Sequence, residues 1–509
     1  MRNWQAARRT EHVLLGIIVL AGFLVRAIRL QPFAVTHWDE AAIWSGAQFF
    51  LSFGRTGDYM ALTSPPLPPM LFAVGALFGG VQGAVWVAVI FGSANIALIY
   101  FLTKKLLSPA GGFAAAVILA ASGLNVMYSR SLLTETFYVF FLLCTLLASV
   151  WYLRARTLVP LLIVALSAAS LQYTKYNGAL AACPLLAVLA YEVLTVRDQR
   201  QKWRSAVHIA LVGAIISAAI FVNIAALWFT GSLADFKTHY SHYVGKAAAS
   251  PGAIPEYVGM VTPITVLCLA AGGLIFVLLR KRNTDWTIVH IGFVLYVAFL
   301  FSYTFYLRLL APVSIFLIVY ASAAVFALIE LLPAKIYIPV IALVGVAFVL
   351  NTWQDFPRYF ERDHGGYARA AAYLNSLPSS TRVIMATQQN VWTDLRRPVV
   401  FTSRASPREL EKQVADSEEI VLVTDIYAYY KYAPRVVPAF VNRLSPDREI
   451  RTISNPLRFD LVENSLTLEE LKRFESDPEL RDQVYSIRVY KLSAEELRQL
   501  SALLRESRH

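Results

Sequence analysis

The feature that most constrains this chain is a series of long apolar runs that carry almost no charge. Each run is close to the ~20 residues that a helix needs to cross the hydrocarbon core of a bilayer. The runs lie at residues 12–30, 82–106, 110–128, 132–152, 158–174, 179–196, 205–229, 257–279, 286–305, 307–331 and 336–350. The pattern predicts a polytopic α-helical membrane protein with about eleven transmembrane helices. The first run lacks a small-residue cleavage site, so we expect a retained helix.

The composition excludes an ordinary soluble enzyme. Hydrophobic residues make up 57% of the chain and charged residues 16%, and the mean hydropathy is +0.52, whereas globular chains are about 45–50% apolar and about 25% charged. The formal charge of +12 comes from short basic clusters between the apolar runs. That placement predicts membrane orientation, and we expect no nucleic-acid partner. Cys144, Cys183 and Cys268 lie inside apolar runs, with neither disulfide nor metal-ligand spacing.

The basic clusters also predict the topology. If the short stretch 66–80 lies along the interface as a juxtamembrane helix, every cluster falls on one side of the membrane. These clusters are the N-terminus, Lys104-Lys105, Arg154 with Arg156, residues 197–204, residues 280–282 and Lys335. The positive-inside rule then places the N-terminus in the cytoplasm of a multi-pass protein of the cell (inner) membrane. The opposite, periplasmic or extracellular side receives the first external loop at 31–80 and a large loop at 230–256.

From residue 353 the composition changes to alternating charged and apolar stretches. We expect residues 1–352 to form the transmembrane module and residues 353–509 an extracytoplasmic soluble α/β domain. The periodicity predicts helices at 366–377, 407–414 and 494–505, and strands at 382–386, 399–402, 420–423 and 485–491. The chain has no Gly-rich phosphate fingerprint in this region and no internal repeat of fixed period.

The first external loop carries the adjacent carboxylates Asp39 and Glu40 after Trp38. Low dielectric near a bilayer surface raises the pKa of a carboxylate and makes it a better base. The alternative is structural, since Asp39 can cap a helix at 40–53 with Glu40 in its first turn.

Further charged residues stand at the outer ends of predicted spans. Glu135 begins a span, and Arg130 precedes it by five positions. Ionisable residues at such places are costly, which marks them as functional candidates, although the helix dipole also favours an acid in a first turn. Lys175 and Arg308 stand at other outer ends and could neutralise a lipid-linked phosphate. The alternative for Lys175 is snorkelling to the interface.

The large external loop contains His239, His242, Tyr243 and Lys246. Two histidines three apart could share a helix face and bind substrate or a divalent metal. No third ligand is evident from the spacing, so an interfacial belt of aromatic and His side chains is the main alternative. We assign no metal site and no certain cofactor.

The order of these motifs resembles the GT-C superfamily of integral-membrane glycosyltransferases, in the branch of protein O-mannosyltransferases and lipid A aminoarabinose transferases. The resemblance covers residues 1 to about 350. It rests on the acidic doublet after the first span, Ser64-Pro65-Pro66-Leu67, Ser129-Arg130-x-x-Leu133-x-Glu135, Lys175-Tyr176-Asn177-Gly178 and Arg308-x-x-x-Pro312. The chain departs from the pattern at Thr63-Ser64, where the mannosyltransferases have His and the aminoarabinose transferases Lys. Phosphate neutralisation is thereby left to the other basic residues.

The resemblance implies an inverting transferase that uses a sugar carried on a polyprenyl monophosphate. Asp39 would be the general base, Glu40 would orient the acceptor or the helix, and Glu135 would orient the donor sugar or its loop. Three basic residues would hold the donor phosphate, namely Arg130, Lys175 and Arg308. Substrate contacts would come from Tyr128, Tyr176, Asn177, His239, His242, Tyr243 and Lys246.

The sequence therefore predicts a glycosyltransferase that moves one hexose or pentose to a lipid, glycan or protein acceptor on the extracytoplasmic face. Its partners would be the polyprenyl-phosphate sugar, that acceptor and membrane lipids. One alternative is an oligosaccharyltransferase or glycan ligase with a lipid-diphosphate donor. The other is a lipid or solute transporter, although transporters typically show internal repeats with broken helices.

Overall fold

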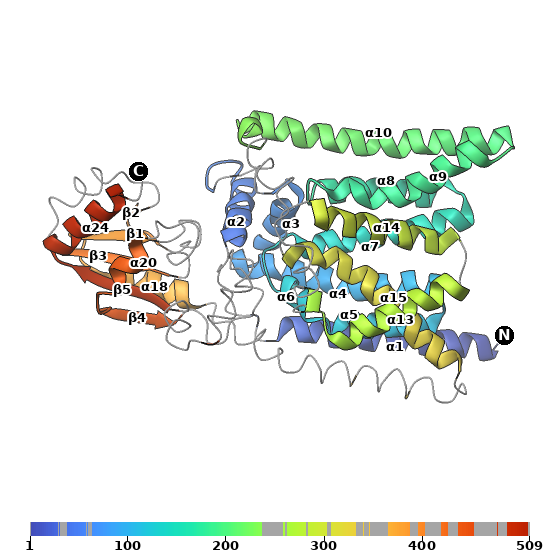
Figure 1. Cartoon of the computed structure of the whole chain (residues 1–509), viewed down its shortest axis with the longest axis horizontal. Coiled ribbons are helices and arrows are strands. Elements are labelled where there is room, and N and C mark those ends of the chain that lie inside the picture. The colour runs from blue at the N-terminus through green and yellow to red at the C-terminus, as the bar shows by residue number, and fades with distance from the viewer. Residues whose placement is uncertain are drawn as a thin grey trace. The chain divides into compact units, whose positions relative to one another are not determined.

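The computed structural model describes residues 2–28, 30, 38–57, 59, 64–236, 258–259, 262–280, 284–302, 307–331, 365–386, 395–402, 419–425, 436–451 and 486–506, with the single residues 339, 346 and 476. By internal contacts the chain divides into two compact units. The first comprises Met1–Leu30 and Ala42–Phe356, and the second comprises Gln31–Ala41 and Pro357–His509. Figure 1 labels the elements of both units.

The first unit is a bundle of helices that run alongside one another (Figure 1). Its elements are α1 (Arg2–Ala27), α3 (Leu67–Ala76), α4 (Gly80–Leu106), α5 (Pro109–Ala120), α6 (Gly123–Tyr128), α7 (Glu135–Ala155), α8 (Leu158–Gln172), η1 (Gly178–Ala182), α9 (Cys183–Thr195), α10 (Gln199–Phe229), α13 (Ile264–Arg280), α14 (Thr284–Ser302), η2 (Leu307–Leu309) and α15 (Leu310–Glu330). Helix α2 (Trp38–Leu51) begins in the second unit and continues in the first.

The apolar runs form helices as predicted. Among the described residues, seven helical segments are long and apolar enough to cross a membrane: Thr10–Ala27, Gly80–Leu106, Glu135–Ala155, Gly178–Thr195, Gln199–Phe229, Thr284–Phe301 and Leu310–Glu330. Three shorter apolar helices, α5, α8 and α13, occupy three more of the predicted spans. Of the run at 336–350 only residues 339 and 346 are described, so the count of eleven stays a prediction. The interfacial stretch at 66–80 contains the ten-residue helix α3, whose depth in a membrane also stays a prediction.

The predicted span at 110–128 is instead two helices, α5 and α6. Ser122 has extended backbone angles (φ −67°, ψ 112°) and separates them. The guanidinium of Arg26 in α1 donates to the carbonyls of Leu119 and Ala120, at 3.4 and 3.2 Å. A helix end leaves its last carbonyls without intrahelical partners, so Arg26 stabilises the break. Hydropathy does not detect such a break because both halves are apolar.

Helix α15 lies at the centre of the bundle and is buried along most of its length. It packs on α13, α5 and α7. Helix α13 approaches α15 so closely that a Cβ added at Gly273 would lie 1.8 Å from the carbonyl oxygen of Tyr320. Only glycine fits at that position.

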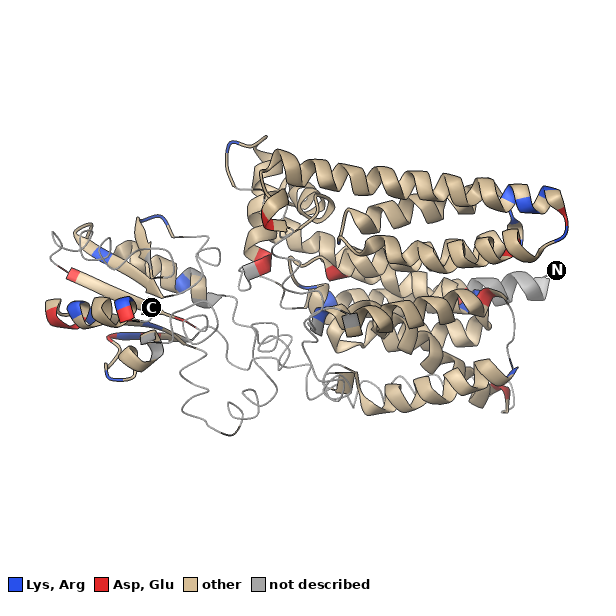
Figure 2. Ribbon diagram, turned by 45° about the horizontal axis from the view of Figure 1, so that its top comes forward, with Lys and Arg blue, Asp and Glu red and all other residues tan. Residues whose placement is uncertain are grey.

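The basic residues described at Lys104-Lys105, Arg154 and Arg156 gather at one end of the bundle. Three ion pairs join helices there: Glu11 with Lys104, Arg154 with Asp285, and Arg156 with Glu192. Arg154 also donates to the carbonyl of Lys105. Figure 2 shows charged residues mainly near the ends of helices. This agrees with the predicted grouping of the clusters, while the side of the membrane that this end faces stays a prediction.

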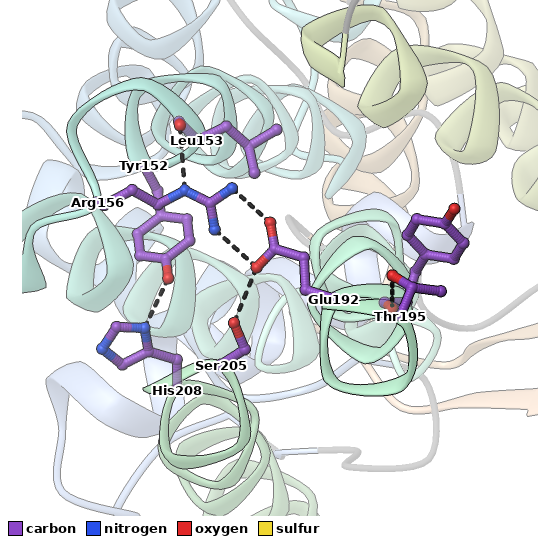
Figure 3. A network of polar contacts seen from close by, with 8 residues as sticks. Tyr152, Leu153, Arg156, Glu192, Thr195, Ser205 and His208 are labelled. Atoms are coloured by element: carbon purple, nitrogen blue, oxygen red, sulfur yellow. Dashed lines mark hydrogen bonds and ion pairs between the residues drawn. The ribbon is translucent and has the colours of Figure 1, made fainter. Parts of the chain in front are cut away.

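Figure 3 shows the polar network around the ion pair of Arg156 and Glu192. The guanidinium of Arg156 donates to both carboxylate oxygens of Glu192, at 2.9 and 2.5 Å, and Ser205 donates to the same carboxylate at 2.8 Å. Tyr152 and His208 share a hydrogen bond of 2.6 Å beside them. The network therefore ties α7, α9 and α10 together at this end.

The second unit contains a five-stranded sheet in the order β2-β1-β3-β5-β4. Its strands are β1 (Thr381–Ala386), β2 (Val399–Phe401), β3 (Glu419–Thr424), β4 (Arg448–Arg451) and β5 (Ser486–Leu492). Strands β2, β1 and β3 are parallel, whereas β5 pairs antiparallel with both β3 and β4. The register places Ile384 beside Leu422 and Leu422 beside Tyr490. These side chains form a core with α20 (Val436–Val441) and α24 (Ala494–Glu506).

The predicted strands at 382–386, 399–402, 420–423 and 485–491 correspond to β1, β2, β3 and β5. The predicted helices at 366–377 and 494–505 are α18 (Gly365–Ser376) and α24, while 407–414 lies outside the described residues. The sequence did not predict α20 or β4. Strand β4 has the sequence Arg-Glu-Ile-Arg. Such a charged composition is typical of edge strands, and it does not show the apolar alternation by which a strand is predicted.

Candidate functional site

Glu135 is the first residue of α7 and lies at the opposite end of that helix from Arg154. The 21 residues of α7 correspond to roughly 30 Å at 1.5 Å per residue. The side chain of Glu135 is 1% exposed. The free N–H groups and dipole at a helix N-terminus favour a carboxylate in the first turn.

Lys175 lies in the turn between α8 and η1. The backbone N–H of Lys175 donates to the carbonyl of Leu171 at 2.8 Å, and its own carbonyl accepts from Gly178 at 2.9 Å. A Cβ added at Gly178 would lie 2.1 and 2.3 Å from the carbonyl carbon and oxygen of Leu171. The turn therefore requires glycine, because the chain packs directly on the end of α8.

Lys175 and Glu135 form an ion pair that joins this turn to α7. The ammonium nitrogen Nζ of Lys175 lies 2.5 Å from Oε1 of Glu135, and the lysine side chain is 19% exposed. Nζ also lies 5.9 Å from the ring centre of Tyr138, within the range of a cation–π interaction. The Tyr138 hydroxyl shares a hydrogen bond of 2.8 Å with Tyr296 of α14. The pair is thus surrounded by groups on α7, on α14 and in the turn that follows α8.

A narrow crevice contains this pair. Its lining includes the predicted residues Glu135, Lys175, Asn177 and Arg308, together with Tyr138, Tyr296, Phe299, Leu309, Ala311 and Pro312. Arg308 enters from η2, immediately before α15. The crevice has a cavity volume of about 10 Å³, which is close to the space that one water molecule needs. A larger anion would need these side chains to move apart.

The second carboxylate oxygen of Glu135, Oε2, has a different environment. Oε2 is buried and has no hydrogen-bond partner within the described residues. Glu135 also borders a second small cavity, which is lined by Arg26, Asn95, Asn125, Tyr128 and Ser129 among others. Tyr128 is 2% exposed. Glu135 therefore separates two polar spaces and uses only one of its oxygens in the ion pair.

Arg130 is directed toward α1. Its Nη1 donates to the carbonyls of Arg26 and Ile28, at 2.6 and 2.7 Å, and its side chain is buried. Arg26 in turn donates to Ser129 at 3.2 Å as well as to the end of α5. Each arginine thus caps a helix near the other, and the segment that leads to Glu135 is fixed between them.

The acidic doublet lies in the first turn of α2. Asp39 is 8% exposed and Glu40 is fully buried. The helix begins at Trp38, so neither carboxylate needs to be its N-cap. Because Gln31–Ala41 groups with the second unit, the position of the doublet relative to Lys175 and Glu135 stays a prediction.

The Pro-Pro-Leu element contacts the turn that carries Lys175. The backbone N–H of Leu67, at the start of α3, donates to the carbonyl of Tyr173 at 3.1 Å. Tyr59 donates to the carbonyl of Ser64 at 3.2 Å. The first external loop is therefore attached to the same end of the bundle as the crevice.

The structure describes only some of the remaining residues that were predicted to contact substrate. Tyr176 packs edge-on against Phe236, with 4.9 Å between ring centres, and burial raises the pKa of its hydroxyl, which therefore stays neutral. His239, His242, Tyr243 and Lys246 lie outside the described residues. Among the described residues, no group of three His, Cys, Asp or Glu side chains is placed to hold a metal ion.

Sequence reasoning missed the tyrosine pair and the buried arginine. Tyr138 follows Glu135 by three positions and so lies on the same face of α7, a spacing that could have drawn attention to it. Tyr296 gives no such signal, because its partner is 158 positions away in the sequence. Arg26 is a charge inside the first span, and an intramembrane charge is a functional candidate by default.

Residues 63–228 match the family model described as dolichyl-phosphate-mannose-protein mannosyltransferase, and these residues include both Glu135 and Lys175. No curated protein matches the chain. Among solved structures, the chain is similar to ArnT from Cupriavidus metallidurans bound to undecaprenyl phosphate, with a TM-score of 0.63 and 11% identity over 95% of this chain and 98% of that chain. The apo form of that protein gives a TM-score of 0.62 and 12% identity over 96% and 99%.

A second group of similar structures comes from an archaeon. The oligosaccharyltransferase AglB from Archaeoglobus fulgidus, in complex with an inhibitory peptide and a dolichol-phosphate, has a TM-score of 0.54 and 12% identity. The match covers 85% of this chain and 72% of that chain.

Proposed function

We propose, from the premise that the chain has the GT-C fold in the branch of ArnT and the protein mannosyltransferases, that it is an inverting glycosyltransferase. It transfers a single sugar from a polyprenyl-phosphate donor to a lipid, glycan or protein acceptor on the extracytoplasmic face. Two of the similar structures hold a polyprenyl-type phosphate, undecaprenyl phosphate in ArnT and dolichol-phosphate in AglB. The same class of ligand fits the charges of the crevice.

The observation that carries this proposal is the grouping of Glu135, Lys175 and Arg308 in one crevice. A phosphate needs hydrogen-bond donors and positive charge, which the ammonium and the guanidinium supply. A sugar carries hydroxyls, and a carboxylate accepts hydrogen bonds from them. One carboxylate beside two cationic side chains is therefore suited to a sugar phosphate. Lys175 and Arg308 would contact the phosphate, and Glu135 would face the sugar.

Donor binding would exchange the partner of Lys175. In the structure the lysine neutralises Glu135, and the crevice has space for about one water molecule. An arriving phosphate competes with the carboxylate for the ammonium and opens the crevice as the pair separates. Glu135 then keeps two acceptor oxygens near the sugar, which offsets the loss of its ion pair.

The reaction needs a base and no acid. Attack of the acceptor on the anomeric carbon forms the new glycosidic bond and breaks the bond to the phosphate, which leaves with the electron pair. A phosphate is a good leaving group when cations neutralise it. The acceptor proton goes to a carboxylate, and we assign that role to Asp39, with Glu40 beside it to orient the first turn of α2.

Other residues of the site would act around these groups. Asn177 lines the crevice and can bond to the donor, while Tyr176 and Tyr128 stay candidates for substrate contact. Arg130 was predicted as a phosphate ligand, and its contacts with α1 favour a positioning role for the segment before Glu135.

Two alternatives remain separable by experiment. An oligosaccharyltransferase would use a lipid diphosphate. The structural similarity to AglB is the reason to test this alternative. A transporter would move a lipid or solute without consuming donor. Supplying the same sugar on a monophosphate and on a diphosphate carrier distinguishes the first alternative, and release of carrier phosphate distinguishes the second.

The direct test of the proposal uses membranes that contain the Asp39→Asn variant and a panel of radiolabelled polyprenyl-phosphate hexoses and pentoses. Loss of a general base lowers the rate by about 10²–10⁴-fold. The exposed Asp235 in the described chain gives a matched control, since Asp235→Asn makes the same chemical change elsewhere and should keep wild-type transfer. Wild-type transfer by Asp39→Asn, at equal membrane insertion, would refute the base assignment.

A further inference from the structure

Helices α13 and α14 follow one another in the chain and share α15 as a neighbour, whereas α14 also packs on α9 and α7. Helix α13 packs against α15, with Gly273 on the backbone of Tyr320. Helix α14 packs against α9 and α7, and Figure 1 shows it beside α7, away from α13. The two helices are separated by only residues 281–283 in the sequence. A space lies between α9, α13 and α14.

That space is a cavity with a volume of about 720 Å³. Its walls come from α9, α13 and α14, and they consist of Ala187, Val188, Tyr191, Val277, Leu278, Thr284, Trp286, Thr287, His290 and Ile291. The volume falls within the roughly 300–1,000 Å³ of typical ligand sites. It is far larger than the crevice around Lys175.

One wall of the cavity is held rigid by an aromatic stack. The rings of Trp286 and Tyr320 are nearly parallel, with 6.1 Å between their centres. The ring of His290 packs near both of them, with its centre 5.7 Å from that of Tyr320 and 6.1 Å from that of Trp286. The His290 nitrogen Nδ1 shares a hydrogen bond of 2.8 Å with the Tyr320 hydroxyl. These contacts hold the side chains of this wall against α15.

The chemistry of the cavity fits a membrane lipid. Its inner walls are mainly aliphatic and aromatic, and Leu278 and Tyr191 at its edge are 51% and 67% exposed on apolar helices. Hydrocarbon is the medium around such helices, so an acyl chain can enter from the side. Water would find few partners on these walls.

The polar end of the cavity favours an anionic headgroup. Arg280 is the last residue of α13 and is exposed, and two further basic residues follow it in the sequence. The hydroxyls of Thr284 and Thr287 stand at the start of α14, where the helix dipole favours negative charge. Asp285 is the nearby acid, and its carboxylate is neutralised by Arg154 at 2.8 and 2.7 Å.

We propose that this cavity binds one anionic phospholipid, with an acyl chain between α9, α13 and α14 and its phosphate beside Arg280 and Thr284. The site is distinct from the proposed donor crevice. Thr284 and Phe299 are at the two ends of α14, and 15 residues of helix correspond to roughly 22 Å. The lipid fills a gap beside the helix that carries Tyr296 into the crevice, so it would hold α14 in position.

The test is native mass spectrometry of the full-length protein in mixed micelles of dioleoylphosphatidylglycerol and dioleoylphosphatidylcholine. The wild type should retain one phosphatidylglycerol in preference to phosphatidylcholine. Ala187→Trp places a large ring in the cavity and should abolish that retention. Ala190→Trp is the matched control, because Ala190 is also exposed on α9 and is not part of the cavity wall.

Arg280→Gln gives a second variant that leaves the packing of the bundle intact. A basic residue near an anionic lipid surface contributes about 1 kcal/mol, so retention of phosphatidylglycerol should fall about five-fold while phosphatidylcholine is unaffected. Equal retention of the two lipids by the wild type, or equal retention by the Ala187→Trp and Ala190→Trp variants, would overturn the proposal. Displacement of phosphatidylglycerol by one equivalent of undecaprenyl phosphate would also overturn it, by assigning the cavity to the donor lipid.

Discussion

The ion pair between Glu135 and Lys175 gives the sharpest prediction, because its two partners differ in burial. The Glu135 side chain is 1% exposed and the Lys175 side chain 19%. Lys175→Met removes the hydrogen bond of 2.5 Å and leaves a buried carboxylate without its paired lysine. Breaking a buried pair in this way costs about 3–5 kcal/mol. Glu135→Gln leaves the lysine, which reaches solvent more easily, and should cost about 1–2 kcal/mol.

The double variant separates pairing from simple loss of packing. With both charges removed, the two neutral side chains should be less destabilised than the sum of the single variants, by a coupling of about 1–3 kcal/mol. Thermal unfolding of the purified protein, followed by intrinsic fluorescence, measures all four members of the cycle. Additive effects would show that the two side chains do not depend on each other and would contradict the pair as an energetic unit.

The same variants test the exchange of partners on donor binding. A charge-assisted hydrogen bond contributes about 1.5–3 kcal/mol, so Lys175→Met should raise the donor KM by about 10- to 100-fold. Lys175→Arg keeps the positive charge and should restore part of the affinity. An unchanged donor KM in Lys175→Met, with transfer otherwise intact, would remove Lys175 from the phosphate site.

Three further predictions concern other parts of the chain. Gly178→Ala should lower the unfolding temperature and transfer together, because its Cβ would lie 2.1 Å from the backbone of α8, whereas Gly213→Ala meets nothing within 4 Å and should be neutral or slightly stabilising. Arg156→Gln removes the cation that pairs with a buried glutamate (Figure 3) and should cost about 1–3 kcal/mol in thermal unfolding without changing the donor KM. In the second unit, the hydrogen bond from Lys491 holds the pKa of the Glu419 carboxyl below its ordinary value of 4.5. The ionised carboxylate therefore stabilises the fold above pH 4.5, and this stabilisation is lost as the pH falls through the lower pKa of the folded state. Acid unfolding of Glu419→Gln should therefore depend less steeply on pH below 4.5 than that of the wild type.

The sequence brought Glu135, Lys175 and Arg308 together, and the structure places these three in one crevice, whereas Arg130, predicted with them, contacts α1 instead. Lys175, Glu135 and Arg308 each stand at the outer end of an apolar run, and alternate ends of consecutive spans meet on one side of a membrane. Their joint presence in the lining follows from topology. The same reasoning predicted that the basic clusters gather at the other end, as the ion pairs of Arg154 and Arg156 show.

The sequence was not sufficient for features that depend on backbone direction or on distant partners. Hydropathy treats residues 110–128 as one run, although the backbone turns at Ser122 and Arg26 stabilises the turn. Likewise, nothing local shows that Arg130 donates to the carbonyl of Arg26. Strand β4 forms because β5 offers it a free edge, which is a property of the sheet and not of its four residues.

The most direct test of the central proposal is a structure of the protein in a lipid nanodisc with a bound polyprenyl monophosphate. The account predicts phosphate density in contact with Nζ of Lys175 and with Arg308, a separated Glu135, and the carboxylate of Asp39 facing the same space. Density for the phosphate away from Lys175, with the Glu135–Lys175 pair intact, would contradict it.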